Sequence, residues 1–224
     1  MELFHKSDVI YYPSQVEVDE ISKLAPELTV RAVPAYIYED DDATITKPFH
    51  ERSDILFVGG FGHKPNTDAV LWFVQKVFPQ ILSEIPDIKF YIVGSNPPDV
   101  VKNLISDNII VTGFVTDEQL SEYYRNTKLV VVPLRYGAGV KGKVVEAMYN
   151  GAPIVTTRVG SEGLPGIEDY LIECDDSDTF AELVCTIYRD HNRLMDLSQK
   201  SKSYIKKYFS EESALNILSK DISY

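Results

Sequence analysis

Short apolar runs rich in Val, Ile, Leu and Tyr recur along the chain and alternate with longer helical stretches. Most of these runs are continuous rather than interrupted by polar residues, which is typical of strands in a parallel sheet covered on both faces. This βαβα alternation predicts the α/β class, with a doubly wound, Rossmann-like parallel sheet flanked by helices. The expected strands lie at 9–13, 29–33, 54–58, 89–93, 109–112, 128–133, 153–157 and 170–173.

The stretches between the strands are expected to form helices. Asn66 and Thr116 are predicted N-caps, because their side chains can accept hydrogen bonds from free backbone N–H groups. Gly151 stands where a glycine after a helix C-terminus is favoured. The expected helices lie at 66–84, 98–106, 117–125, 140–150 and 177–189, and three further helices are expected up to Ser219.

Composition excludes several classes of protein. The 224 residues carry a formal net charge of −12, which argues against nucleic acid as a partner because phosphate backbones bind basic surfaces. A small anion is still compatible with a local basic pocket. The two cysteines, Cys174 and Cys185, have no zinc-site spacing, so no metal is expected. With no apolar stretch of membrane-spanning length and no signal peptide, the sequence predicts a cytoplasmic protein.

One boundary between domains is visible. Residues 39–53, EDDDATITKPFHERS, combine an acidic run, a proline and no periodicity, and are predicted to be a linker. Residues 1–38 are too few for an independent α/β domain, so they are interpreted either as the end of a larger domain or as an addition to the main sheet. The main domain is expected at 54–224.

Two glycine-rich loops are predicted to face each other. If the strand order of the main domain is the usual 3-2-1-4-5-6, its first and fourth strands are neighbours at the switch point, where ligands bind. The loop after the first strand is GGFGHKPN, with Gly60, His63 and Lys64; the loop after the fourth is LRYGAGVKGK, with Gly137 and Gly139. Topology and composition therefore indicate one binding crevice.

The second loop is suited to an anion. Glycines allow close backbone approach, and a following helix N-terminus directs free N–H groups and a positive dipole end at a phosphate. Arg135, Lys141 and Lys143 are within reach; the alternative is that these three form a solvated helix start. Glu146, inside the helix, is suited to the hydroxyls of a ribose. Its alternative is an exposed residue that pairs with Lys143.

The glycine triplet of the second loop, Gly137, Gly139 and Gly142, also matches the GxGxxG fingerprint of dinucleotide-binding folds. It follows the fourth strand rather than the first, and no acidic residue stands where the ribose contact of NAD would be. Arg158 is near that place and would suit the phosphate of NADP. An NADP-binding oxidoreductase is therefore one hypothesis for the function.

Several segments carry a resemblance to a known family. PLRYGAGVKGKVVEAMYNGAPIVTTRVGSEGL resembles the signature of family 4 glycosyltransferases, or glycosyl transferases group 1, of the GT-B fold. FVGGFGHKPNTDAVLWFVQKVFPQI, FYIVGSNPP and VTGFVTDEQLSEYYRNTKLVVVP resemble preceding parts of its C-terminal domain in the same order. Residues 1–38 look like the last unit of its N-terminal acceptor domain.

The resemblance implies a retaining, metal-independent glycosyltransferase whose donor is a nucleotide-diphosphate sugar and whose acceptor is a sugar or a lipid-linked molecule. It implies that Glu146 binds the donor ribose and that the glycine loop with Arg135, Lys141 and Lys143 meets the diphosphate. Backbone groups near Phe114 and Val115 would touch the base. No cofactor is implied.

The chain departs from the family pattern at two places. A glutamate expected from the resemblance is replaced by Ala138, and the family's usual Arg and Lys after the first strand are not reproduced, with His63 and Lys64 nearby but out of register. A catalytically silent nucleotide-binding scaffold is therefore the alternative function. The stretch at 200–209, KSKSYIKKYF, mixes lysines and aromatics and fits either a closing helix or a peripheral membrane contact.

Overall fold

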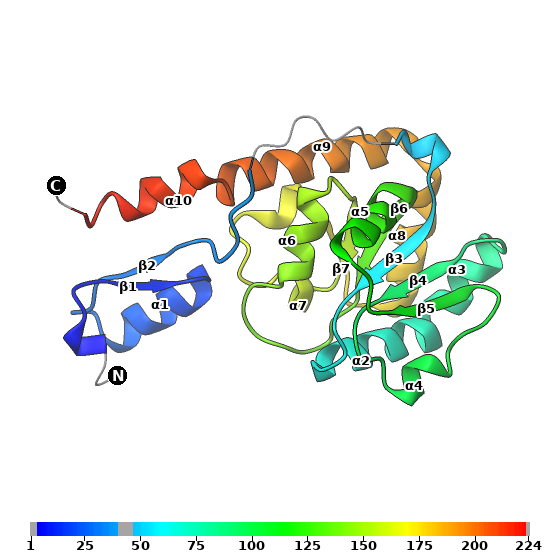
Figure 1. Cartoon of the computed structure of the whole chain (residues 1–224), viewed down its shortest axis with the longest axis horizontal. Helices are drawn as coiled ribbons and strands as arrows, with labels where there is room; N and C mark the ends of the chain where they lie inside the picture. The colour runs from blue at the N-terminus through cyan, green and yellow to red at the C-terminus, as the bar shows by residue number, and fades with distance from the viewer. Residues whose placement is uncertain (1–3, 40–46, 223–224) are drawn as a thin grey trace.

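The structure, a computed structural model, describes residues 4–39 and 47–222. Its main sheet has six parallel strands in the order β5-β4-β3-β6-β7-β8, which confirms the predicted α/β class and the expected 3-2-1-4-5-6 order (Figure 1). These strands are β3 (Ser53–Val58), β4 (Phe90–Val93), β5 (Ile109–Gly113), β6 (Thr127–Val132), β7 (Ile154–Thr156) and β8 (Ile172–Glu173).

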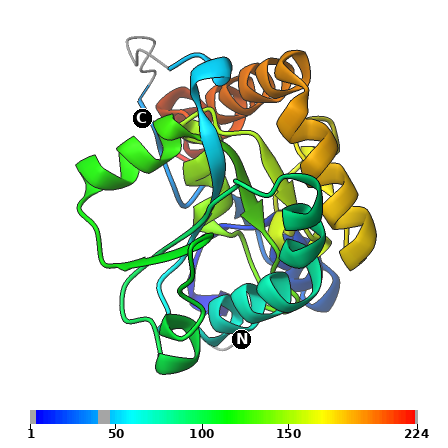
Figure 2. The ribbon, with the colours of Figure 1, turned by 90° about the vertical axis from the view of Figure 1, so that its right-hand side faces the viewer.

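The central strands explain why their sequences are apolar throughout. In β3 and β6, residues of both pleat faces are buried, among them Leu56, Phe57, Val130 and Val131. Helices cover the two faces of the sheet, as Figure 2 shows. The helical elements after β3 are α2 (Lys64–Trp72), η3 (Phe73–Val77), α3 (Phe78–Glu84), α4 (Asp99–Lys102), α5 (Asp117–Asn126), α6 (Gly142–Tyr149), α7 (Arg158–Ser161), η4 (Ile167–Asp169), α8 (Ser177–Arg189), α9 (His191–Tyr208) and α10 (Glu211–Leu218).

Several predicted helix boundaries differ from the structure. The helix expected at 66–84 is divided by a π-helical turn at Phe73–Val77, just before Pro79, whose ring and missing N–H interrupt a regular helix. The helix expected at 98–106 is limited to α4, and two helices, α9 and α10, follow α8 where three were expected.

The predicted helix caps have mixed outcomes. Thr116 forms a capping box with Gln119, and Gly151 has a left-handed φ of 63° after α6, so both predictions are confirmed. Asn66 was wrong as an N-cap, because α2 begins at Lys64 and the N-cap position belongs to His63, whose side chain makes no cap hydrogen bond. The Asn66 side chain instead donates to the carbonyl oxygen of Gly60 at 2.6 Å.

The N-terminal residues form a unit of their own, composed of η1 (Phe4–Lys6), β1 (Ile10–Tyr12), α1 (Gln15–Leu24) and β2 (Val30–Ala32). Strands β1 and β2 pair in parallel as a separate two-stranded sheet, so the interpretation as an addition to the main sheet was wrong. Figure 1 shows this N-terminal unit beside the main sheet, with α10 extending over it. Its assignment to an acceptor domain stays a prediction.

The predicted linker at 39–53 is described only in part, because residues 40–46 lie outside the described residues. Its last part contains a 3₁₀ turn, η2 (Phe49–Glu51), and the beginning of β3. Phe49 is buried against the hydrophobic core. The part of the segment next to β3 is therefore packed against the main domain.

Candidate functional site

The two glycine-rich loops meet at the carboxyl ends of β3 and β6. Lys143, in the first turn of α6, donates a hydrogen bond from Nζ to Oδ1 of Asn66 in α2. Since Asn66 also bonds the carbonyl of Gly60, one lysine connects the N-terminus of α6 to the loop after β3. The two loops that the sequence placed at the switch point are therefore in contact, and their role as a binding crevice stays a prediction.

Glycines make this close approach possible. A Cβ on Gly59 would lie only 2.5 Å from Nζ of Lys143, so any side chain there would displace the lysine. Gly137 and Gly139 have positive φ angles of 132° and 76°, which L-residues with a Cβ rarely adopt. The backbone after β6 consequently follows a path that other residues would not allow.

Lys143 is the group of this site with the most unusual electrostatics. Its side chain is largely buried, and its Nζ lies 4.5 Å from the centroid of the Phe57 ring. Burial, together with the charge of Lys141, lowers the pKa of Lys143 to about 7. Among the residues that the structure describes, no carboxylate forms an ion pair with Lys143. A cation without a counter-ion, at a helix N-terminus, favours an anionic ligand.

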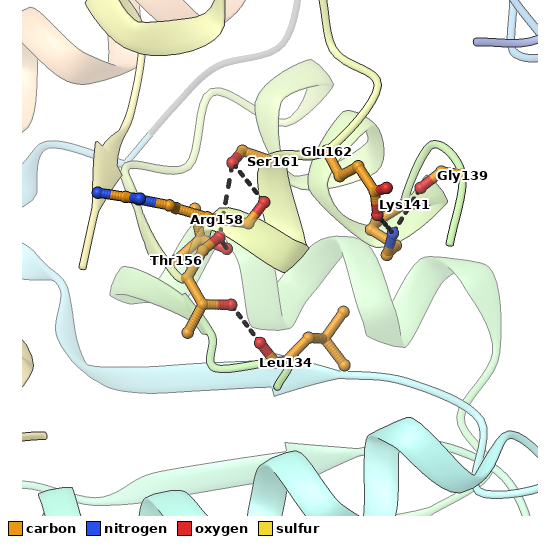
Figure 3. Close-up of polar contacts among 8 residues, drawn as sticks. Leu134, Gly139, Lys141, Thr156, Arg158, Ser161 and Glu162 are labelled. Carbon is orange, nitrogen blue, oxygen red and sulfur yellow. Dashed lines mark hydrogen bonds and ion pairs between the residues drawn. The ribbon is translucent and has the colours of Figure 1, made fainter. Parts of the chain in front are cut away.

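Lys141, the N-cap residue of α6, is buried but paired. Its Nζ donates to the carbonyl oxygen of Gly139 at 2.5 Å and lies 3.3 Å from Oε2 of Glu162. Figure 3 shows the Glu162 and Lys141 side chains pointing toward each other beside Gly139. Glu162 was not among the predicted site residues. In the sequence it was marked only by its place a few residues after the expected strand at 153–157.

Glu146 forms no ion pair with Lys143 in the described part of the chain and contacts α5 instead. Its Oε2 accepts a hydrogen bond of 3.1 Å from the hydroxyl of Tyr124, which is fully buried in α5. Burial raises the pKa of Glu146, and the Tyr124 hydrogen bond opposes that effect. The alternative of an exposed Glu146 paired with Lys143 was therefore wrong. No described residue forms a hydrogen bond with its Oε1.

Other predicted residues are not gathered around Lys143. Arg135 forms a two-pronged ion pair with Asp68 of α2, with Nε 2.8 Å from Oδ2. His63 and Lys64 are exposed at the start of α2. Val115 lines a different pocket of about 310 Å³, beside Tyr91 and Tyr123.

The exposure of several aromatic residues bears on a ligand or membrane contact. Phe114 is 77% exposed, whereas Phe73 is fully buried, as expected of a core residue. In the 200–209 stretch, Tyr204 and Phe209 are buried, so these aromatics are not presented to a surface. None of the helices in the described part of the chain combines the length and apolar character needed to span a bilayer.

Residues of the N-terminal unit and of the segment that follows it approach glycines of the main domain, which sequence reasoning missed. A Cβ on Gly142 would lie 2.5 Å from the hydroxyl oxygen of Tyr36, and one on Gly139 would lie 3.7 Å from Oε1 of Glu17. A Cβ on Gly163 would lie 3.0 Å from Oγ of Ser14. These contacts join residues far apart in the sequence, and only the position of Ser14 after a short apolar run hinted at them.

The part of the chain that the structure describes holds no group of three or more His, Cys, Asp and Glu residues arranged to bind a metal ion. Arg158, the residue proposed for an NADP phosphate, forms an ion pair with Asp175 at 3.5 Å. In Figure 3 its side chain extends away from Lys141 and Glu162. It therefore does not join the glycine loop in one site.

Two curated relatives are proteins of a cps region. An uncharacterized 44.6 kDa protein in the cps region of Klebsiella pneumoniae is 26% identical over 176 residues, which cover 75% of this chain and 45% of that protein. An uncharacterized 41.2 kDa protein from the same region is 25% identical over 141 residues, 60% of this chain and 36% of that protein. The chain thus spans less than half the length of these relatives.

Solved structures share the fold. A mutant of S. aureus TarM in complex with Fondaparinux, alpha-GlcNAc-glycerol and UDP superposes with a TM-score of 0.77 at 17% identity, over 98% of this chain and 44% of TarM. WaaG, a glycosyltransferase involved in lipopolysaccharide biosynthesis, superposes with a TM-score of 0.67 at 17% identity, over 92% of this chain and 62% of WaaG. These neighbours confirm the expected GT-B type of α/β fold.

The family itself is identified by sequence. The model of glycosyl transferases group 1 matches residues 52–190, more than half of the chain, and includes both glycine loops and Glu146. This match overturns the oxidoreductase hypothesis, which depended on the glycine triplet and Arg158. The chain belongs to the glycosyl transferases group 1 family.

Proposed function

We propose that this chain binds the nucleotide-diphosphate sugar donor of a retaining, metal-independent glycosyltransferase. The observation that carries the proposal is Lys143, a largely buried amine with no carboxylate partner among the described residues, at the N-terminus of α6. A diphosphate would neutralise the charge of its protonated form and accept hydrogen bonds from the free N–H groups of the helix.

The chemistry follows from what these groups can stabilise. When a glycosidic bond to a nucleoside diphosphate breaks, negative charge develops on the leaving phosphate. Lys143 and the N-terminus of α6 are positioned to stabilise that charge, and the glycine loop allows the phosphate to approach the backbone. Glu146, with Oε1 open, would accept hydrogen bonds from the ribose.

The relatives support a substrate class. Two curated relatives are encoded in a cps region, and UDP is present in the TarM complex. UDP-sugars are therefore the first donors to test, and a growing saccharide, free or lipid-linked, is the acceptor class that fits best. Catalysis on such an acceptor at the inner face of the membrane belongs to the same proposal.

The proposal is tested by binding of UDP and uridine to the wild-type chain and to Lys143→Met, measured by calorimetry. We expect UDP affinity to fall at least a hundredfold in the variant, while uridine affinity changes less than threefold, because only UDP carries the diphosphate. Lys102→Met, which removes an exposed lysine paired with Asp99, is the matched control and should change neither. Equal losses for UDP and uridine would remove Lys143 from the phosphate role.

A thermal-shift series with UDP, GDP and ADP, with and without EDTA, tests the other parts. A ligand present at 100 times its dissociation constant stabilises the native state by about 2.7 kcal/mol, which is readily measured. One diphosphate should shift the melting temperature equally with and without EDTA. A shift that EDTA abolishes would contradict metal independence.

A catalytically silent scaffold is the second candidate function. It is favoured by Ala138, whose methyl group stands in the glycine loop where the family resemblance implies a glutamate. Such a scaffold would bind the nucleotide sugar without cleaving it. Release of UDP from a bound UDP-sugar in the presence of saccharide acceptors would exclude the scaffold.

A further inference from the structure

The start of α1 lies against Gly163 and carries a buried hydroxyl that has no partner among the described residues. Ser14 is 1% exposed and occupies the N-cap position of α1, where a serine normally accepts a hydrogen bond from the helix backbone. Here the side chain makes no cap hydrogen bond, and Oγ has no partner among the described residues. A buried serine in the best position for capping, with its hydroxyl uncommitted, is available to a ligand.

Glu17, one turn further along α1, shows the same property. Its Oε2 is buried and has no hydrogen-bond partner in the described part of the chain, although a carboxylate in this place loses hydration. Its Oε1 lies 3.7 Å from the position of a Cβ on Gly139. Glu17 lies in the first turn of α1, where the helix dipole interacts favourably with an acidic side chain.

The opposite wall supplies complementary groups. Nζ of Lys141 lies at the carbonyl of Gly139 and at Glu162, and Gly163 follows directly. Oγ of Ser14 is 3.0 Å from the position of a Cβ on Gly163, so the serine hydroxyl lies against the residue after Glu162. Two uncommitted polar groups of the N-terminal unit thus face a lysine and a glutamate of the main domain.

The mixture of charges decides the class of ligand. A divalent cation is disfavoured by Lys141, and a second anionic group is disfavoured by Glu17 and Glu162. Neighbouring hydroxyl groups fit both, because each hydroxyl donates to a carboxylate and accepts from an ammonium or another hydroxyl. This place is also adjacent to the first turn of α6, which contains Lys143.

We propose that Ser14 and Glu17, together with Lys141 and Glu162, form the subsite for the sugar of the donor, so that the N-terminal unit selects the glycosyl group. This inference rests on the proposed function, in which Lys143 holds the diphosphate to which that sugar is attached. The acidic groups on both walls accept from sugar hydroxyls, and Lys141 donates to a sugar oxygen.

The test separates sugar binding from diphosphate binding. A thermal-shift series with UDP-glucose, UDP-galactose, UDP-N-acetylglucosamine and GDP-mannose selects the nucleotide sugar. Calorimetry then gives the dissociation constants of that compound and of its own nucleoside diphosphate for wild type, Glu17→Gln and Ser14→Ala. Glu20→Gln is the matched control, because Glu20 is an exposed carboxylate on the same helix, paired with Lys23.

We expect the preference for the nucleotide sugar over the diphosphate to fall at least tenfold in Glu17→Gln and at least threefold in Ser14→Ala. Diphosphate affinity itself should stay within twofold in all variants, and the control should keep the wild-type preference. An unchanged preference in Glu17→Gln, or equal losses for both ligands, would overturn the sugar subsite and leave the diphosphate site intact. Failure of every diphosphate to bind the wild type would overturn the proposed function, and the subsite with it.

Discussion

The N-terminal unit meets the rest of the chain in two regions that differ in how their polar groups are satisfied. Just after α10, Asp221 accepts hydrogen bonds from Nε and Nη2 of Arg31, both at 2.6 Å, and one of 3.0 Å from the hydroxyl of Tyr11. At the crevice, the described residues provide no hydrogen-bond partner for Oγ of Ser14 or Oε2 of Glu17, and none of their carboxylates forms an ion pair with Lys143.

This difference in hydrogen bonding indicates that the two regions of the interface have different roles. The contact at Asp221 is complete without a ligand, and the Arg31 hydrogen bonds hold the pKa of Asp221 below its usual range. The crevice leaves hydrogen-bonding capacity unused, which costs folding free energy. Such a cost is expected at sites that gain their partners on binding. We expect the first contact to hold the N-terminal unit in place, and the second to recognise the proposed ligand.

The largest expected effect is the pH dependence of diphosphate binding at Lys143. Because burial lowers its pKa to about 7 in the free protein, the lysine is mostly neutral above that pH and must take up a proton to bind a diphosphate. We expect diphosphate affinity to fall about tenfold per pH unit from about pH 7 to 9, since each pKa unit corresponds to about 1.4 kcal/mol. Calorimetry in buffers of different ionisation heat should count close to one proton taken up at about pH 8.

The stability of the free protein depends on the same lysine, but it changes with pH in the opposite direction to the affinity. Between about pH 7 and 10 the unfolded chain holds the proton that the folded chain has lost, so the stability of the free protein rises with pH in this window. Both slopes should disappear in Lys143→Met and persist in Lys102→Met. If the affinity of the wild-type protein does not depend on pH, a counter-ion already keeps Lys143 protonated in the free protein. The contrast with the paired Arg31 would then be lost.

Breaking the satisfied contact is expected to have a smaller effect. Asp221→Ala leaves Arg31 without its acceptor and should release the N-terminal unit, as faster amide exchange in β1 and α1 would report. We expect the affinity for the nucleotide sugar to fall about fivefold, with diphosphate affinity within twofold. Asn216→Ala, an exposed change in α10, is the control. Unchanged exchange in β1 and α1 would mean that this contact does not hold the wall.

The smallest test compares two helix caps. Thr116 accepts from the backbone N–H of Gln119, so Thr116→Ala should destabilise the fold by about 1 kcal/mol, or roughly 2–4 °C in melting temperature. Ser14→Ala removes no cap hydrogen bond and should lower the melting temperature by less than Thr116→Ala does. Thermal denaturation followed by circular dichroism measures both. A larger loss in Ser14→Ala would show that the serine hydroxyl stabilises the free protein.

Local sequence patterns predicted the sheet and the contact between the two glycine loops. Strands buried on both faces leave continuous apolar runs, and glycine loops at strand ends follow from the backbone approach that a crevice requires. Gly137, Gly139 and Lys143 were therefore identifiable without a structure. The π-helical turn before Pro79 was not, because one proline only indicates that a helix is perturbed, not how the backbone compensates.

Side-chain partners that are distant in the sequence were beyond such patterns. Arg135 was expected at a phosphate, yet Asp68, 67 positions earlier, forms an ion pair with it. Ser14 and Glu17 reach the glycine loop only because the N-terminal unit is held against the main domain, and no periodicity encodes that docking. The candidate site was thus predictable on one wall and not on the other.

The link between Arg31 and Asp221 joins positions 190 residues apart. During synthesis from the N-terminus onward, Arg31 leaves the ribosome long before Asp221, and both glycine loops are made between them. The two glycine loops can thus come together on the growing chain before the docking contact exists, and that contact carries the entropic cost of closing one very long loop. Selection of a sugar would therefore be acquired later in synthesis than the ability to hold a phosphate.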